Sequence, residues 1–192
     1  MAKRAVLIHG WGGSPEEGWR PWLRNELEKR EFEVHVPPMP DTEHPKIDAW
    51  LKQLIDTVGD PDKDLYLVGH SLGCITILRY LEILQVGQEI GGAVLVAGFS
   101  DLKISVDADE DVTELKSFFE TDVDFEKVKS HCKKFVAIHS DDDPYVSLRY
   151  ADIFKGKLDA EVIIEHNMKH FSGGDGVTEL PVALDSLIKL SG

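Results

Sequence analysis

Residues 65–75 read Leu-Tyr-Leu-Val-Gly-His-Ser-Leu-Gly-Cys-Ile, an apolar strand pattern that passes through Gly-x-Ser-x-Gly into an apolar helical pattern. Where a strand turns directly into a helix, the residue at the turn is strained, and its neighbours two positions away must have little or no side chain. Gly69 and Gly73 supply that room around Ser71. The spacing predicts a sharp turn that projects the Ser71 hydroxyl above a sheet edge, where helix N–H groups favour developing negative charge.

The motif alone is weak evidence, because ordinary glycine and serine frequencies produce it by chance in roughly one chain in fifteen of this length. A simple tight turn from strand to helix needs only one glycine. That interpretation leaves the second glycine and the serine between them unexplained.

Short apolar runs alternate with segments of helical spacing, which is the pattern of a parallel sheet built from βαβ units. The runs are nearly continuous in apolar residues, as expected of strands covered on both faces. The 192 residues are enough for one domain, so we predict a single α/β domain over 1–192 with a doubly wound, mostly parallel sheet of about six strands and helices on both faces. Strands are predicted at 4–9, 33–36, 65–68, 93–97, 135–139 and 161–165, and helices at 19–30, 45–58, 72–86, within 112–129, at 146–155 and at 178–190.

The stretch 98–123 is largely irregular and gathers acidic residues. A stretch of that length in a compact domain is often a lid or binding loop. An acidic, solvated surface loop explains the same composition, so both interpretations remain open. The carboxylates concerned include Asp101, Asp107, Asp109, Glu110 and Asp111.

A serine hydroxyl is a poor nucleophile at neutral pH, so Ser71 needs a base within hydrogen-bonding distance and a third group that fixes the tautomer of that base. The expected order along the chain is serine, acid, histidine. Three aspartates at 141–143 follow the predicted strand 135–139, and His166 and His170 follow the last predicted strand. Aspartates at such turns also cap helices and shape the turn, which is our interpretation of Asp141.

Several segments together resemble the α/β-hydrolases. Residues 69–73 are similar to the nucleophile elbow of that superfamily, and residues 9–13 (His-Gly-Trp-Gly-Gly) look like its oxyanion loop. With the small size, the aromatic residues in 19–23 and the segments 142–146 and 169–171, the chain is similar to a compact bacterial family of serine hydrolases. That family also includes the human retinoblastoma-binding serine hydrolase. The resemblance covers essentially the whole chain and implies a minimal α/β-hydrolase without a full cap domain.

The resemblance also implies a role for each candidate residue. Ser71 would be the nucleophile. The acid of this family sits immediately before a proline, which selects Asp143 and leaves Asp142 as the alternative. The base is a histidine followed by an aromatic residue in the loop beyond the last strand, which favours His170 over His166.

An oxyanion hole is expected from two backbone N–H groups. One belongs to Leu72, directly after the nucleophile, and the other to the loop after the first strand, where we expect Trp11. Other residues around the motifs are expected to shape the site without transferring protons. These are His9, Gly10, Gly12, Gly13, Gly69, His70 and Gly73.

The formal net charge of −14 argues against nucleic acid and anionic membranes as partners, because both require basic surface. The apolar stretch 5–8 is too short for a signal core or a membrane span, so we expect a cytoplasmic protein. Cys74 and Cys132 are expected to be small buried hydrophobes.

Two kinds of ligand site are disfavoured. His166 and His170 have the spacing of a metal pair, but the helical His-Glu-x-x-His signature is absent. The glycines of 10–13 differ from a dinucleotide loop, because Pro15 stands where the third glycine would be and the second strand lacks an acidic ribose partner. We therefore expect neither a metal nor an organic cofactor.

These patterns predict hydrolysis of a small ester, or less favourably an amide or thioester, through an acyl-serine intermediate. The alternative is a non-catalytic protein-interaction module on the same fold. If the acidic stretch overhangs the site, neutral acyl esters should be preferred over esters that carry a carboxylate. Trp11, Trp19 and Trp22 should then offer apolar surface to the acyl chain.

Overall fold

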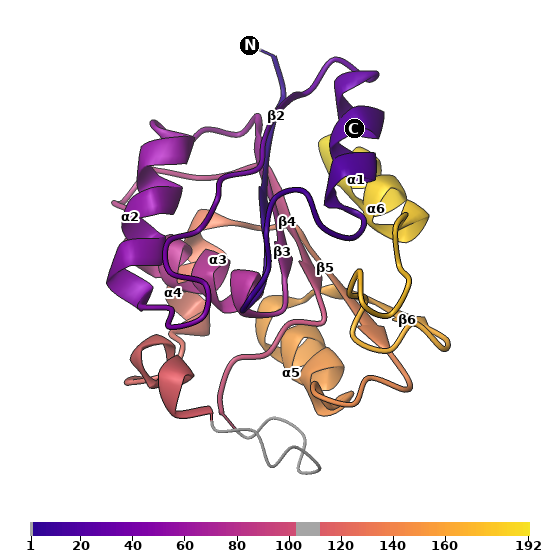
Figure 1. Ribbon diagram of the computed structural model, residues 1–192. Helices are drawn as coiled ribbons and strands as arrows, with labels where there is room; N and C mark the ends of the chain where they lie inside the picture. The colour runs from indigo at the N-terminus through magenta and orange to yellow at the C-terminus, as the bar shows by residue number, and fades with distance from the viewer. Residues whose placement is uncertain (1, 103–111) are drawn as a thin grey trace.

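The computed structural model describes residues 2–102 and 112–192, in which six parallel strands form one sheet with helices on both faces (Figure 1). The strand order is β2-β1-β3-β4-β5-β6. This confirms the predicted α/β class. The strands are β1 (Arg4–Ile8), β2 (Glu33–His35), β3 (Leu65–His70), β4 (Gly92–Val96), β5 (Phe135–Ser140) and β6 (Glu161–Glu165). The helices are α1 (Arg20–Glu28), α2 (Ile47–Val58), α3 (Leu72–Ile83), the 3-10 helix η1 (Val112–Phe118), α4 (Phe125–His131), α5 (Arg149–Leu158) and α6 (Pro181–Ser191).

Alternate residues of each central strand enter two apolar clusters, one on each face of the sheet. In β1, Val6 and Ile8 join one cluster, whereas Ala5 and Leu7 join the other. Helices α2, α3, α4 and α5 cover the first face, and α1 and α6 lie together on the second (Figure 1). Because both faces are buried, the strand sequences are apolar without alternation.

The beginning of the last helix differs from the prediction. Helix α6 starts at Pro181 instead of residue 178, and Leu180 before it has φ −140° and ψ 75°, outside the helical region. A proline disfavours helical backbone in the residue before it, which explains the later start. The side chain of Leu180 makes no capping hydrogen bond.

Strands β1 and β3 pair side by side, and the helices that follow them, α1 and α3, lie on opposite faces of the sheet. Such a divergence opens a crevice at the carboxyl ends of the two strands, where α/β sheets bind ligands. The loop after β1 and the turn after β3 both meet this crevice.

The described parts of the stretch 98–123 belong partly to the core, because Phe99, Leu115 and Phe118 are buried. These three apolar side chains anchor the stretch to the core, while other residues of it, such as Lys116 and Glu120, are exposed. Asp107, Asp109, Glu110 and Asp111 lie outside the described residues, so the lid interpretation stays a prediction. Within 2–102 and 112–192, no helix has both the length and the apolar character needed to cross a membrane.

Candidate active site

Ser71 occupies the turn between β3 and α3 with φ 53° and ψ −118°, a conformation that a residue with a side chain rarely adopts. Its backbone N–H donates to the carbonyl of Val96 at 2.9 Å, which ties the turn to the neighbouring strand. A Cβ atom on Gly73 would lie 2.4 Å from the carbonyl oxygen of Ile8, and one on Gly69 would lie 2.8 Å from the backbone nitrogen of Cys74. Both glycines are thus required sterically.

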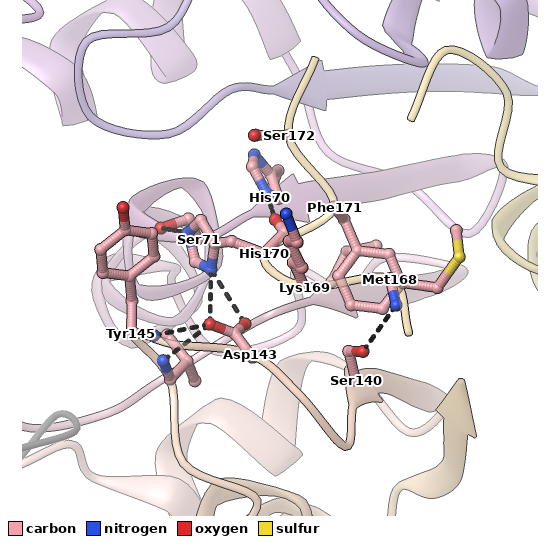
Figure 2. A network of polar contacts seen from close by, with 12 residues as sticks. His70, Ser71, Ser140, Asp143, Tyr145, Met168, Lys169, His170, Phe171 and Ser172 are labelled. Carbon is pink, nitrogen blue, oxygen red and sulfur yellow. Dashed lines mark hydrogen bonds and ion pairs between the residues drawn. The ribbon is translucent and has the colours of Figure 1, made fainter. Parts of the chain in front are cut away.

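Three side chains from separate parts of the chain form a continuous hydrogen-bonded row (Figure 2). Nε2 of His170 lies 2.9 Å from Oγ of Ser71, and Nδ1 lies 2.9 Å from Oδ2 of Asp143. Because an ionised carboxylate only accepts hydrogen bonds, Nδ1 carries the ring proton and Nε2 presents its lone pair to the serine. The side chains of His170 and Asp143 are 14% and 2% exposed, so the row is shielded from water.

The carboxylate of Asp143 is itself held in place by the backbone that follows it. Oδ1 accepts hydrogen bonds from the N–H groups of Tyr145 and Val146, each at 2.9 Å (Figure 2). The ring of Tyr145 packs edge-on against the imidazole of His170, with centroids 5.1 Å apart. The acid is therefore oriented by two donors while it orients the imidazole.

The end of β5 and the turn after it also hold the loop that carries His170. Oγ of Ser140 accepts the N–H of Met168 at 3.0 Å, and Oδ1 of Asp142 accepts the N–H of Lys169 at 2.8 Å. One residue earlier, Asp141 pairs with the ring of His166 and accepts the N–H of Asn167. The alternative acid Asp142 thus holds the backbone of this loop, and the alternative base His166 pairs with Asp141. Neither side chain is hydrogen-bonded to Ser71, His170 or Asp143.

Two ring N–H groups hold the same loop from the opposite side. Nε2 of His70 donates to the carbonyl of His170 at 2.7 Å, and Nε1 of Trp19 donates to the carbonyl of Phe171 at 3.0 Å. Within the loop, three residues other than glycine have positive φ, namely Asn167, Lys169 and Phe171. Such backbone persists only where its surroundings hold it, and the hydrogen bonds from both sides supply that constraint.

The two expected oxyanion donors lie next to the serine in the fold. A Cβ atom on Gly10 would lie 3.0 Å from Cβ of Ser71, so the loop after β1 packs directly against this residue. The N–H of Gly12 donates to Thr42 and that of Gly13 to Gly10. Within the described residues, the N–H groups of Trp11 and Leu72 have no protein acceptor. Both are available to a developing oxyanion.

Ser71 opens into a small pocket with a volume of about 100 Å³. Of the tryptophans expected to offer surface there, Trp11 lines the pocket, whereas Trp19 is buried under α1 beside His70. Trp22 packs against the same cluster as Trp19. The expectation is therefore wrong for Trp19, because this residue, directly before α1, packs its side chain into the core. The pocket is lined by Gly10, Trp11, Gly12, Gly13, Glu17, Arg20, His70, Ser71, His170, Ser172 and Gly173.

His9 and His70 are buried and neutral. Burial lowers the pKa of His9, whose Nδ1 donates to Gly10 while Nε2 accepts the N–H of Met39. Burial, followed by the nearby His170, places the pKa of His70 well below its usual range. These rings act as fixed hydrogen-bonding groups that shape the site.

Several other side chains that could take part in chemistry are buried or paired. Cys74 and Cys132 are buried, and burial raises the pKa of Cys132 to about 12. Asp101, expected to add negative potential at the site, forms an ion pair with Arg149 and accepts the hydroxyl of Tyr150. Among the residues described, His, Cys, Asp and Glu form no group of three or more that could hold a metal ion.

Several residues around the site were not predicted as functional, among them Glu17, Arg20, Ser140 and Ser172. Arg20 lines the pocket, and Ser140 accepts a hydrogen bond from the loop that carries His170. An arginine between two tryptophans at the start of an amphipathic helix is a weak signal of burial. No local pattern distinguishes Ser140 from any serine at the end of a strand.

The chain is similar to known hydrolases over most of its length. A model of the serine hydrolase family matches residues 5–189. YdeN of Bacillus subtilis (strain 168), named as a hydrolase, is 31% identical over 97% of this chain and 95% of its own length. The serine hydrolase RBBP9 of Rattus norvegicus is 27% identical over 88% of this chain and 87% of its own length.

Solved structures extend the comparison. The crystal structure of YdeN has a TM-score of 0.89 with this chain and covers 98% of both chains. Est1E from Butyrivibrio proteoclasticus has a TM-score of 0.73 at 15% identity, covering 98% of this chain and 88% of that chain. This second likeness concerns the fold alone.

Proposed function

The chain belongs to the serine hydrolase family, and from this premise we propose that it cleaves small carboxylic esters through an acyl-serine intermediate. In this proposal Ser71 is the nucleophile, His170 is the general base and Asp143 orients the base. Amides and thioesters follow the same chemistry with a different leaving group.

The reaction proceeds in two halves. Oγ of Ser71 attacks the ester carbonyl while Nε2 of His170 takes the hydroxyl proton, and Asp143 stabilises the imidazolium that forms. The N–H groups of Trp11 and Leu72 bind the oxyanion. The imidazolium then protonates the departing alcohol. In the second half, water loses a proton to His170 and attacks the acyl-serine. The bond from the acyl carbon to Oγ breaks, the imidazolium returns the proton to Oγ of Ser71, and the carboxylic acid is released.

The row of hydrogen bonds from Ser71 through His170 to Asp143 is the observation that carries the proposal. A largely shielded base with its lone pair 2.9 Å from a serine hydroxyl meets the geometric requirement for general-base activation. A structural role for the serine would not need its base to be oriented in turn by a nearly fully buried carboxylate.

The proposal is tested with 4-nitrophenyl acetate, whose leaving group is released at formation of the acyl enzyme. We expect turnover by the wild type, and trapping of an acetyl group on Ser71 by acid quench and peptide mapping. Ser71→Ala should abolish both signals while the circular dichroism spectrum stays unchanged. Equal turnover by wild type and Ser71→Ala would refute the assignment.

The second candidate is a non-catalytic interaction module on the same fold. The complete Ser-His-Asp row disfavours it, because a binding module gains nothing from a shielded base. The preference for neutral esters depended on Asp107, Asp109, Glu110 and Asp111, which the structure does not describe, so it stays a prediction from the sequence. The residues that line the described pocket include the cation Arg20 as well as the carboxylate Glu17.

A further inference from the structure

Arg20 places a buried positive charge in the same pocket as the serine hydroxyl. The residue is 3% exposed and lines the pocket of about 100 Å³ together with Ser71 and His170. Its Nε donates to the carbonyl of Ser14 at 2.9 Å, which fixes the position of the guanidinium plane. Burial lowers the pKa of Arg20, yet a guanidinium stays charged at neutral pH.

The charge of Arg20 is only partly compensated by protein groups. Nη2 of Arg20 lies 3.7 Å from Oε2 of Glu17, beyond hydrogen-bonding distance, and the Glu17 side chain is 46% exposed. In the described part of the chain, the two terminal amino groups of Arg20 have no hydrogen-bond acceptor. A buried guanidinium with four unused N–H donors is costly unless an anion or water pairs with it.

The chemistry of the guanidinium identifies the class of ligand. Its planar fork matches a carboxylate, which can accept two parallel hydrogen bonds. A single cation in a small pocket balances one negative charge, which favours a carboxylate over a doubly charged phosphate. Because Arg20 is buried, salt screens its attraction less than it screens surface charges.

On the basis of the proposed function, we infer that Arg20 is a specificity-determining residue, and that the enzyme prefers esters whose acyl or leaving group carries a carboxylate. The substrate carboxylate replaces Glu17 as the partner of the guanidinium and accepts N–H groups directly. The exposed Glu17 side chain then turns toward solvent. This preference is opposite in sign to the one expected from the acidic stretch of the sequence.

The inference is tested with two matched pairs of esters. One pair places the charge on the acyl group, using the 4-nitrophenyl monoesters of glutaric acid and of glutaramic acid. The other places it on the leaving group, using 4-acetoxybenzoate and 4-acetoxybenzamide. Each kcat/KM is divided by the hydroxide-catalysed rate constant of the same ester, which removes differences in intrinsic reactivity. The readout is the ratio of carboxylate to carboxamide ester within each pair.

We expect a ratio of at least about ten in one or both pairs, retained at raised salt, since a charge-assisted hydrogen bond contributes roughly a tenfold effect or more. Arg20→Met should lower the ratio to about one, and Arg20→Lys should keep part of it. Glu17→Gln removes the competing carboxylate and should raise the ratio about threefold, so the test stands even if Arg20→Met does not fold.

Two results would overturn the inference. Cleavage of the neutral esters by the wild type with ratios at or below one in both pairs would refute it and leave the proposed function standing. If neither Arg20→Met nor Glu17→Gln changed the ratio, the preference would come from other charged groups and not from Arg20. If the wild type cleaved none of the four esters, the proposed function itself would fail, and this inference with it.

Discussion

Oδ1 of Asp142 accepts the backbone N–H of Lys169 at 2.8 Å, one residue before His170 in the chain, whereas Oδ2 of Asp143 contacts the ring of His170 itself. Two adjacent carboxylates therefore have different tasks. Asp142 holds the loop, and Asp143 holds the imidazole.

This difference predicts unequal effects of two matched substitutions. Asp143→Asn should lower kcat on an activated aryl ester by about 10³-fold or more, because an amide can no longer fix the tautomer of His170. Asp142→Asn should stay within about tenfold of wild type, since the amide oxygen still accepts the Lys169 N–H. The reverse order of effects in steady-state kinetics would move the acid assignment by one residue.

The three residues of the row should also behave as one unit. Ser71→Ala and His170→Ala should each lower kcat by several orders of magnitude, and the double variant should be hardly slower than either. We expect His166→Ala to keep most of the activity, because His166 pairs with Asp141 instead of the serine. Loss of activity in His166→Ala together with an active His170→Ala would contradict the base assignment.

The glycines of the elbow give a prediction about stability. A Cβ atom on Gly73 would lie 2.4 Å from a backbone carbonyl, so Gly73→Ala should lower the free energy of unfolding by about 3 kcal/mol or more. Gly156 in α5 has no heavy atom within 4 Å of the same added group, so Gly156→Ala is the matched control and should gain roughly 0.5–1 kcal/mol. Urea denaturation of both variants measures the difference, and equal stabilities would refute the steric argument.

His139 on β5 should make stability depend on pH. It is 1% exposed, and burial lowers its pKa to about 4 from an ordinary value of 6.5. The unfolded chain therefore binds the proton more readily, so stability is full above about pH 6.5 and falls as the pH drops toward 4. The loss attributable to this ring is about 3 kcal/mol.

His139→Leu should remove that part of the pH dependence. The two ring nitrogens of His139 lack hydrogen-bond partners within the described residues, so leucine should cost little or nothing at pH 7. The measurement is the free energy of unfolding of both proteins between pH 4 and pH 7. Parallel curves for wild type and variant would show that His139 does not titrate in this window.

Much of the fold follows from local sequence because its causes are local. All six predicted strands overlap observed ones, and β6 has the predicted bounds. The central strands β1, β3, β4 and β5 are buried almost throughout, as their apolar runs require, whereas the edge strand β6 is only partly buried. The two glycines around Ser71 are a steric necessity of the turn, so the motif itself carries the geometry. The sequence predicts the start of α6 three residues too early, because Pro181 disfavours helical backbone at Leu180.

The unpredicted features depend on contacts between distant segments. The loop with Asn167, Lys169 and Phe171 at positive φ has no glycine at these positions, and its hydrogen bonds come from Ser140, Asp142, His70 and Trp19. Such a loop has no local signature. The burial of Arg20 likewise depends on how α1 packs against the sheet, which periodicity alone does not specify.

The central claim is that Ser71 is an activated nucleophile, and covalent labelling tests it most directly. Wild type, Ser71→Ala and His170→Ala are treated with a fluorophosphonate, and the products are analysed by intact mass and peptide mapping. We predict one phosphonyl adduct on Ser71 in the wild type, no adduct in Ser71→Ala and much slower labelling of His170→Ala. A folded wild type that remains unlabelled, or an adduct on a residue other than Ser71, would contradict the claim and favour the non-catalytic interaction module.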